Sequence, residues 1–176
     1  MTGSDFDPVT SISAEHVTAE FDCGSEAQTA WLRRHALQAD RTDSSKVQVV
    51  TRTGDKRVVG YYALSAGSVE PAKAPPRVTR GMPRYPVPVV ILTRLGVHRG
   101  EHGRGLGRAL LKDALLRVAS ASEVIAARAL LIHCEDDDAK GFYLHFAEFE
   151  ESPTDPLQLY LLLSDLRKTF GRPDPE

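Results

Sequence analysis

The stretch LGVHRGEHGRGLGR, residues 95–108, contains the densest cluster of glycines in the chain. Four of them, Gly100, Gly103, Gly105 and Gly107, lie in a turn between an apolar run and an amphipathic run. Free backbone N–H groups at a helix N-terminus, which a ligand approaches closely where side chains are absent, form a site for a phosphate or pyrophosphate. The spacing matches neither GxGxxG nor GxxxxGK[ST], so it indicates neither an NAD-binding fold nor a P-loop. A glycine turn without a ligand is the alternative, but it leaves the entropic cost of these glycines unexplained.

The segments on either side of the turn have clear periodicities. Residues 88–97, PVVILTRLGV, are almost continuously apolar, as in a strand buried on both faces. From Gly105 to about Ala121, apolar residues recur at helical spacing. By the same reasoning, strands are predicted at 47–52, 57–65, 129–134 and 157–163, helices at 25–39 and 136–143, and a long proline-rich loop at 67–87. This mixture without an internal repeat predicts an α+β, or mixed α/β, domain.

Length and composition set limits on the class of protein. The chain has 176 residues, 41% of them hydrophobic, and a net charge of −2, as expected for one ordinary soluble domain. We expect no membrane span, no signal peptide and a cytoplasmic location. Cys23 and Cys134 are too few and too far apart for a disulfide framework or a metal site. Both are therefore predicted to be free thiols, with Cys134 in a strand.

Charge is unevenly distributed along the chain. Residues 77–108 contain seven arginines and a single acid, Glu101, while the rest of the chain is acidic. Arginine forks match the geometry of phosphate oxygens. The basic middle therefore indicates a polyanionic partner, although a solvated arginine-rich loop would give the same pattern.

Several motifs in order along the chain resemble those of known families. His102-Gly103-Arg104-Gly105-Leu106-Gly107 is similar to the acyl-CoA pyrophosphate loop, Q/R-x-x-G-x-G/A, of the GNAT N-acetyltransferases, and Phe142-Tyr143 fits their catalytic helix. A narrower resemblance is to the GNAT toxins of bacterial type II toxin–antitoxin modules. It is carried, over about residues 20–163, by Phe21-Asp22-Cys23-Gly24, by residues 59–64 (VGYYAL), by Met82-Pro83 ahead of Pro86-Val87-Pro88, and by Ser152-Pro153.

The resemblance implies a fold and a domain organisation. It implies a GNAT fold, in which helices flank a central, mixed but mostly antiparallel sheet with a V-shaped split after the fourth core strand. Residues 1–176 would form a single acetyltransferase domain, with flexible ends at 1–16 and 171–176.

The resemblance also assigns an acetyl-CoA site and a catalytic residue. Tyr143 would protonate the departing CoA thiolate, because a phenol of pKa about 10 stays protonated at neutral pH. The backbone of residues 95–97 would follow the pantetheine arm, with an amide near the thioester oxygen. The cofactor-binding residues implied are Leu95, Gly96, Val97, His102, Gly103, Arg104, Gly105, Leu106, Gly107, Arg108 and Phe142. No metal is expected.

The toxin subfamily implies that the acceptor is the α-amino group of aminoacyl-tRNA, whose acetylation blocks translation. The low pKa of such an amine, at most about 8, makes a strong general base unnecessary. Candidates for tRNA phosphate contacts are Arg33, Arg34, Arg77, Arg80 and Arg84. Arg94 lies in the buried strand, where an acid is the expected partner.

Two departures from the family pattern stand in this sequence. His102 replaces the usual Gln or Arg, which removes a side-chain contact but leaves the backbone amides in place. The catalytic helix normally ends in F-Y-x-x-x-G-F, whereas residues 142–149, FYLHFAEF, lack the glycine and contain one extra residue. The turn after Tyr143 is therefore expected to be reshaped.

The resemblance further implies partners, and it leaves alternatives open. It implies a ribbon–helix–helix antitoxin, a homodimer, and contact with operator DNA only through the antitoxin. One alternative is a GNAT enzyme that acetylates a small amine or a protein amine. Another is a catalytically silent module that retains the fold and binds a partner.

Overall fold

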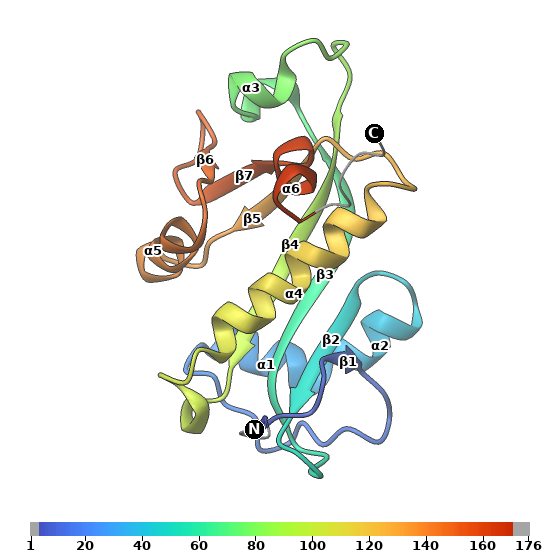
Figure 1. Ribbon diagram of the computed structural model, residues 1–176, viewed down its shortest axis with the longest axis vertical. Coiled ribbons are helices and arrows are strands. Elements are labelled where there is room, and N and C mark those ends of the chain that lie inside the picture. The colour runs from blue at the N-terminus through green and yellow to red at the C-terminus, as the bar shows by residue number, and fades with distance from the viewer. Residues whose placement is uncertain (1–3, 171–176) are drawn as a thin grey trace. The chain divides into compact units, whose positions relative to one another are not determined.

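The computed structural model describes residues 4–170, which form an alternation of strands and helices (Figure 1). The strands are β1 (Thr10–Ser11), β2 (Lys46–Thr51), β3 (Val58–Val69), β4 (Val87–Val97), β5 (Ala129–His133), β6 (Glu150–Glu151) and β7 (Gln158–Leu162). The helices are α1 (Glu26–Arg34), α2 (Ala36–Arg41), α3 (Pro76–Thr79), α4 (Leu106–Ala121), α5 (Asp137–Phe146) and α6 (Leu163–Phe170), with 3-10 turns at Pro71–Lys73 and Arg99–Glu101.

Within this part of the chain the strands form one seven-stranded sheet in the order β1-β2-β3-β4-β5-β7-β6. The pairs β1/β2, β2/β3, β5/β7 and β6/β7 are antiparallel, whereas β4 and β5 are parallel. The β4/β5 ladder covers only Val89–Leu92 of β4, although β4 continues to Val97. The mixed, mostly antiparallel sheet is as predicted.

The chain divides into two compact units, each built from two separate segments. Of the described residues, unit 1 comprises 4–65 with 93–114, and unit 2 comprises 66–92 with 115–170. The elements β3, β4 and α4 each contribute residues to both units. The cofactor loop predicted from the sequence belongs to unit 1, and the predicted catalytic tyrosine belongs to unit 2.

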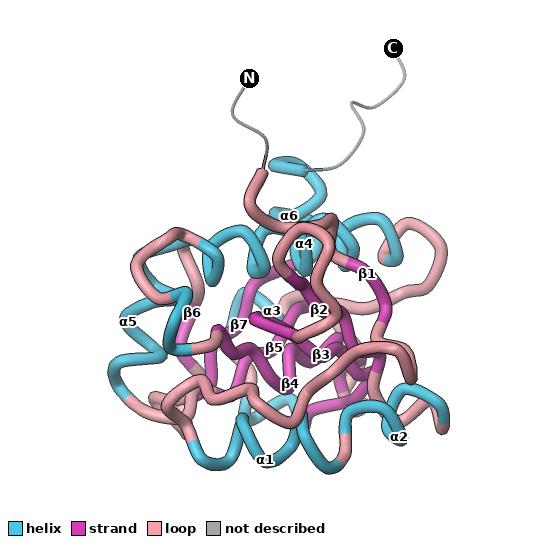
Figure 2. The backbone as a smooth tube through the Cα atoms, turned by 90° about the horizontal axis from the view of Figure 1, so that it is seen from below, coloured by secondary structure: helices cyan, strands magenta, loops and turns pink. Residues whose placement is uncertain are grey.

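In unit 1, helices lie on both faces of the strands (Figure 2). Adjacent residues of β3 show this directly, because neighbouring side chains of a strand point to opposite faces. The Tyr61 hydroxyl donates to the Gln28 carbonyl of α1 at 2.6 Å, and the Tyr62 hydroxyl donates to the Asp113 carboxylate of α4. The core beneath α1 and α2 is formed by fully buried residues that include Phe21, Leu32, Ala36, Val47, Val49 and Tyr61.

Unit 2 has its own core, formed by Ala74, Val78, Val87, Val89, Ala129, Leu131, Tyr160 and Leu162. The segment around α3 is attached to this core through Arg128. The Arg128 guanidinium donates to the carbonyl oxygens of Val78 at 2.8 Å and Arg80 at 3.1 Å. The proline-rich segment therefore has a defined path although few of its residues are in regular structure.

The strands and helices follow the predicted pattern, with several local differences. The helix predicted at 25–39 is two helices, because the chain departs from helical geometry at His35 (φ −124°), which ends α1 and precedes α2. Ser25, the first residue of that predicted helix, is the N-cap of α1, and its side chain accepts from the Gln28 N–H. Within the predicted loop at 67–87, β3 continues to Val69 and α3 forms a single turn.

Three further segments differ from expectation. The segment from Leu163, where no helix is predicted, forms α6, whose Leu163 and Leu166 are buried while Arg167 and Lys168 lie in its last turn. The prediction that Cys134 lies in a strand is wrong by one residue, because β5 ends at His133. Cys134 is buried and Cys23 is half-buried, and both are free thiols. Residues 10–11, expected in a flexible end, add the edge strand β1, and 171–176 lie outside the described residues.

Candidate active site

The glycine turn at the end of β4 has the backbone geometry of an open anion-binding loop. Gly103 and Gly105 have φ values of +79° and +78°, in the left-handed region that favours glycine. A Cβ placed on either residue would meet no heavy atom within 4 Å, so the space above the loop is open. Directly after Gly105, α4 begins at Leu106 and presents its first N–H groups. The site therefore offers unobstructed backbone donors at the positive end of a helix.

Two side chains hold the loop in place. The exposed His102 donates from Nε2 to the carbonyl oxygen of Val97 at 2.7 Å, which joins the loop to the last residue of β4. Glu101 is only 4% exposed and accepts from Arg52 at 2.5 Å and from Arg104 at 3.2 Å. Arg104 is thus engaged within the protein, and the histidine that departs from the family pattern has a structural contact of its own.

The last residues of β4 pack against the segment before α1. Gly96 is buried, and a Cβ placed on it would lie 3.2 Å from both Cys23 Sγ and a ring carbon of Tyr61. That spacing is tighter than ordinary van der Waals contact, so a side chain here would push Cys23 or Tyr61 aside by a few tenths of an ångström, and glycine allows the close packing. Leu95 and Val97, which point to the opposite face, are half-buried.

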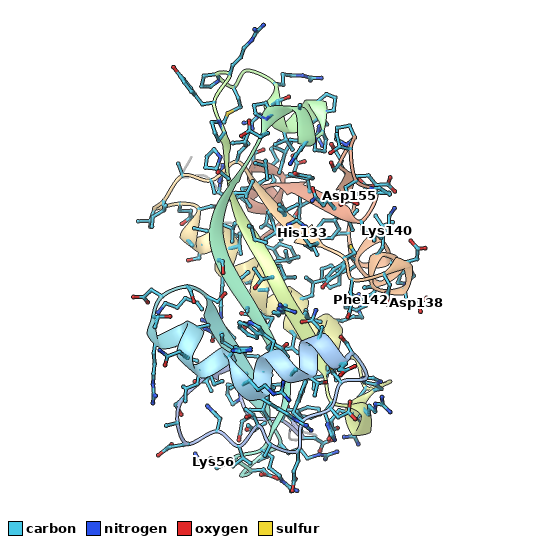
Figure 3. The ribbon with its side chains drawn as sticks, turned by 180° about the vertical axis from the view of Figure 1, so that it is seen from behind. Lys56, His133, Asp138, Lys140, Phe142 and Asp155 are labelled. Carbon is cyan, nitrogen blue, oxygen red and sulfur yellow. The ribbon has the colours of Figure 1, made fainter. Side chains whose placement is uncertain are left out.

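The predicted catalytic tyrosine lies on α5 in unit 2. Asp136 caps this helix by accepting from the Ala139 N–H at 2.8 Å, and Figure 3 labels Phe142 on the same helix. Tyr143 is 7% exposed, and its ring makes edge contacts with Phe142 at 5.2 Å and Phe149 at 6.3 Å between centroids. Among residues 4–170 its hydroxyl has no hydrogen-bond partner.

Burial controls the protonation of Tyr143. Desolvation, together with the nearby thiol of Cys134, raises the pKa of its phenol well above the usual value of 10. The pKa of Cys134 is itself raised to about 11, mainly by burial. Both groups are therefore protonated at neutral pH, and the Tyr143 hydroxyl is a proton donor without a protein acceptor.

The turn after Tyr143 is formed without the family's glycine. Ala147 ends α5 in an extended conformation (φ −155°), which any residue adopts, and its N–H donates to the Tyr143 carbonyl at 3.2 Å. The chain then returns Phe149 to the ring of Tyr143. The extra residue is thus accommodated by extended backbone rather than by a left-handed turn.

The arginines proposed as tRNA contacts have different surroundings in the two units. Arg33 and Arg34 are exposed in the last turn of α1 and, with Arg99, line a hollow of about 380 Å³. Asp22 and Glu26 also line it. The pKa of Asp22 is lowered, first by the Gly24 N–H and then by Arg99, whose Nε lies 3.3 Å from the carboxylate.

The remaining candidates belong to unit 2. Arg77 is held by two carboxylates, those of Glu150 at 2.8 Å and Asp165 at 3.0 Å, and both hydrogen bonds raise its pKa. Arg80 and Arg84 are exposed in the segment between α3 and β4. Arg77 therefore differs from the other four candidates, because its guanidinium is already paired.

Arg94 does not have the acidic partner expected for a buried strand. It lies on β4, half-buried, with its guanidinium 5.5 Å from the ring centroid of Trp31 and 3.4 Å from the side-chain oxygen of Gln28. No carboxylate within residues 4–170 forms an ion pair with it. The expectation of an acid at this position is wrong, because aromatic and amide groups of α1 occupy that face of β4.

Sequence reasoning missed two residues that shape unit 1. Glu101 is the single acid in the arginine-rich segment, and that isolation was the available signal for a buried ion pair. Trp31 lies within the helix predicted at 25–39. Its position opposite Arg94 has no signal in the sequence, since 63 residues separate the two.

The fold and the glycine loop define a class of protein, and comparison with known proteins agrees with it. The model of the acetyltransferase (GNAT) family matches residues 13–149, and the chain belongs to this family. It is 49% identical over 158 residues to a tRNA-acetylating toxin from Mycobacterium tuberculosis, a match that covers 90% of this chain and 92% of the relative.

Solved structures of related toxins have the same fold. AtaT complexed with acetyl-methionyl-tRNAfMet superposes with a TM-score of 0.85 at 25% identity, covering 94% of this chain and 99% of AtaT. A tyrosine-to-phenylalanine mutant of AtaT, bound to the C-terminus of the antitoxin AtaR and to acetyl-CoA, has a TM-score of 0.80 at 23% identity, covering 96% and 100%. The predicted GNAT fold is thus confirmed.

The described residues contain neither a membrane-crossing helix nor a metal-binding cluster. None of their helices combines the length and the apolar character needed to cross a bilayer. No group of three or more potential ligands among His, Cys, Asp and Glu in residues 4–170 is arranged to hold a metal ion.

Proposed function

We propose that this protein is a toxin acetyltransferase that transfers the acetyl group of acetyl-CoA to the α-amino group of an aminoacyl-tRNA and so blocks translation. The observation that carries this proposal is the 49% identity, over nine-tenths of both chains, to a protein named as a tRNA-acetylating toxin. Membership of the GNAT family supports acetyl transfer as the reaction. The named activity of the relative supports tRNA as the acceptor.

The glycine loop fits the pyrophosphate of acetyl-CoA. Its backbone donors are open at Gly103 and Gly105, and they stand at the N-terminus of the sixteen-residue helix α4. When bound there, acetyl-CoA supplies the activated acetyl group. His102 and Glu101 keep the loop in its donor conformation, and the backbone of Leu95, Gly96 and Val97 is proposed to follow the pantetheine arm and to offer an amide to the thioester oxygen.

Tyr143 is proposed as the general acid. Its hydroxyl is protonated at neutral pH, as a phenol of ordinary pKa already is, and burial raises that pKa further. No acceptor among residues 4–170 competes for its proton. It therefore supplies the proton that the leaving thiol requires. Phe142 and Phe149 fix the orientation of its ring.

The acceptor amine needs little activation by the protein. An α-amino group has a pKa of about 7.7 to 8.0, so part of it is neutral at physiological pH. None of the chain's histidines is therefore assigned the role of a dedicated base.

The tRNA is proposed to contact exposed arginines in both units. Arg33 and Arg34 line the hollow beside α1, and Arg80 and Arg84 lie in the segment before β4. Such contacts bind phosphates independently of sequence. Arg77 was part of the same prediction, but its two carboxylate partners favour a structural contribution.

The related structures suggest partners for this chain. AtaT binds the C-terminus of its antitoxin AtaR, and we propose an antitoxin of the ribbon–helix–helix class for this protein as well, with operator DNA contacted through the antitoxin. A homodimer and a cytoplasmic location, where aminoacyl-tRNA is found, complete the proposal.

The test follows labelled acetyl groups from acetyl-CoA into total tRNA, charged and deacylated, with the wild type and Tyr143→Phe. We expect label only in charged tRNA and a loss of about 10²- to 10⁴-fold in Tyr143→Phe, the range for a general acid. Tyr160→Phe is the matched control, because Tyr160 is also a buried tyrosine of unit 2 and its hydroxyl has no partner within the described chain.

Other results would redirect the proposal. Label in neither tRNA pool, with acetyl-CoA still binding, would favour a small amine or a protein amine as acceptor. If acetyl-CoA failed to raise the melting temperature of the wild type, the silent binding module would be favoured instead.

A further inference from the structure

Arg94 is a half-buried cation whose partners leave most of its hydrogen-bonding capacity unused. A guanidinium has five N–H donors in a planar fork. One N–H of Arg94 makes a long hydrogen bond of 3.4 Å to Gln28, and the group lies over the ring of Trp31. Within residues 4–170 no carboxylate pairs with it. A desolvated arginine of this kind has the geometry and the charge to accept an anion from outside the chain.

The surroundings of Arg94 hold it in one position. Trp31 is stacked on Tyr61 at 6.0 Å between ring centroids, with an angle of 13° between the planes. Gln28 is held in turn by Tyr61, whose hydroxyl donates to the main-chain carbonyl oxygen of Gln28 at 2.6 Å and lies 3.4 Å from its side-chain oxygen. Since Tyr61 is fully buried, the indole and the amide next to Arg94 are anchored to the core of unit 1.

The position of Arg94 separates it from the loop proposed to hold the pyrophosphate. The glycine loop leads into α4, whereas Arg94 contacts α1, and these two helices lie on opposite faces of β3, as Tyr61 and Tyr62 show. Arg94 is therefore not a further ligand of that loop. It lies on the same face of β4 as Gly96, two residues and about 7 Å along the strand.

The distance of about 7 Å between Arg94 and Gly96 indicates the class of anion, and this step rests on the proposed function. The reacting amine must come to the backbone at Gly96, and in an aminoacyl-tRNA the nearest phosphodiester is one nucleoside away from this amine. A phosphate at Arg94 would thus belong to the acceptor and would place its amino group at Gly96. A planar guanidinium, with an indole behind it, suits such an oxyanion.

We propose that Arg94, supported by Trp31 and Gln28, binds the last phosphodiester of the aminoacyl-tRNA acceptor end and positions the aminoacyl ester for transfer. Arg94 is a positioning residue in this role, since it touches the substrate away from the reacting atoms. The inference rests on the proposed function and adds to it the residue that recognises the nucleotide end of the acceptor.

The test compares two small acceptors that differ only in the phosphate. These are 3′-O-aminoacyl-adenosine with and without its 5′-phosphate, carrying the amino acid found by the labelling experiment. We expect the wild type to have a kcat/KM about tenfold higher for the phosphorylated acceptor, mostly through KM, since charge-assisted hydrogen bonds have effects of this size. In Arg94→Met this preference is expected to disappear, because the rate with the phosphorylated acceptor falls much further than the rate with the unphosphorylated one.

Two variants control for structural effects. Arg94→Lys keeps the cation but not the fork, and we expect it to retain part of the preference. Arg41→Met, at the exposed end of α2, removes an arginine of unit 1 that has no ion-pair partner in the described chain, and it should behave as wild type. Stabilisation of each variant by acetyl-CoA reports whether unit 1 is folded.

An inhibition measurement tests the same contact without requiring the two small acceptors to react at a measurable rate. The deacylated trinucleotide CCA should inhibit acetylation of aminoacyl-tRNA about tenfold less well in Arg94→Met than in the wild type. Unchanged inhibition, a preference that persists in Arg94→Met, or equal losses with both small acceptors would overturn the assignment of Arg94. Failure of the wild type to acetylate any aminoacyl-tRNA would instead contradict the proposed function, so the two failures are distinguishable.

Discussion

Arg94 in unit 1 and Arg77 in unit 2 come from the same arginine-rich segment but have opposite surroundings. Arg77 is exposed and held by two carboxylates, Glu150 and Asp165. Arg94 is half-buried, and its contacts are an indole and an amide. The arginine that solvent reaches more easily is thus the one already neutralised by the protein, while the more buried one keeps its charge for a ligand.

The comparison shows that the charge of a sequence segment does not measure its capacity to bind a polyanion. Seven arginines and one acid predict a basic surface. In the structure, Arg77, Arg99 and Arg104 each contact a carboxylate. The capacity of an arginine to bind phosphate therefore depends on whether a carboxylate of the protein already pairs with it. Three predictions test this difference between paired and unpaired arginines.

The largest effect on stability is expected from Glu101, the buried acid that two arginines share. Glu101→Gln removes the charge that Arg52 and Arg104 contact, and we expect a loss of about 2 kcal/mol in the free energy of unfolding. The value is below that for a fully buried pair, because both arginines are 44% exposed. Urea denaturation measures it.

A surface pair provides the control for Glu101. Glu15 lies 3.6 Å from Lys56, and both side chains are exposed, so Glu15→Gln should change stability by less than about 0.5 kcal/mol. Equal losses in the two variants would show that burial of Glu101 contributes nothing to its ion pairs.

A smaller loss of stability is expected on replacing Arg77 or Arg94, and its dependence on salt concentration distinguishes the two arginines. Arg77→Met loses two partly exposed ion pairs, and we expect a small destabilisation that decreases between low and 1 M salt. Arg94→Met loses a cation–π contact of about 1 kcal/mol, and this loss should not depend on salt. A salt-dependent loss in Arg94→Met would mean that Arg94 has an acidic partner, and the comparison would fail.

The smallest effect is local and concerns an exposed pair. Hydrogen bonds from the Arg57 side chain, and then from its backbone N–H, lower the pKa of Asp55 from 3.8 to about 2. Since the folded pKa lies below the unfolded one, the pair stabilises the fold above pH 4, and its contribution is lost as the pH falls toward 2. Arg57→Met should raise the pKa of Asp55 toward 3.8 in an NMR titration. An unchanged pKa would show that the side-chain contact is absent in solution.

Much of the fold followed from local patterns. The apolar run at 88–97, the helix after the glycine turn and the strand at 129–134 are observed within one or two residues of the prediction. The errors have local causes that only the folded chain reveals. The break at His35 interrupts a continuous helical pattern, and α6 is stabilised by burying Leu163 and Leu166 rather than by propensity.

The sequence by itself determined the glycine turn, the strand before it and the helix after it, because each depends on interactions between residues close in the chain. The motifs that carry the family resemblance are local for the same reason. Tertiary structure alone decided which charges meet. Arg77 finds its acids 73 and 88 residues away, and Arg94 lies over Trp31 and away from any acid of the described chain. Coulomb and hydrogen-bond energies depend on distance in space, which the order of residues does not specify.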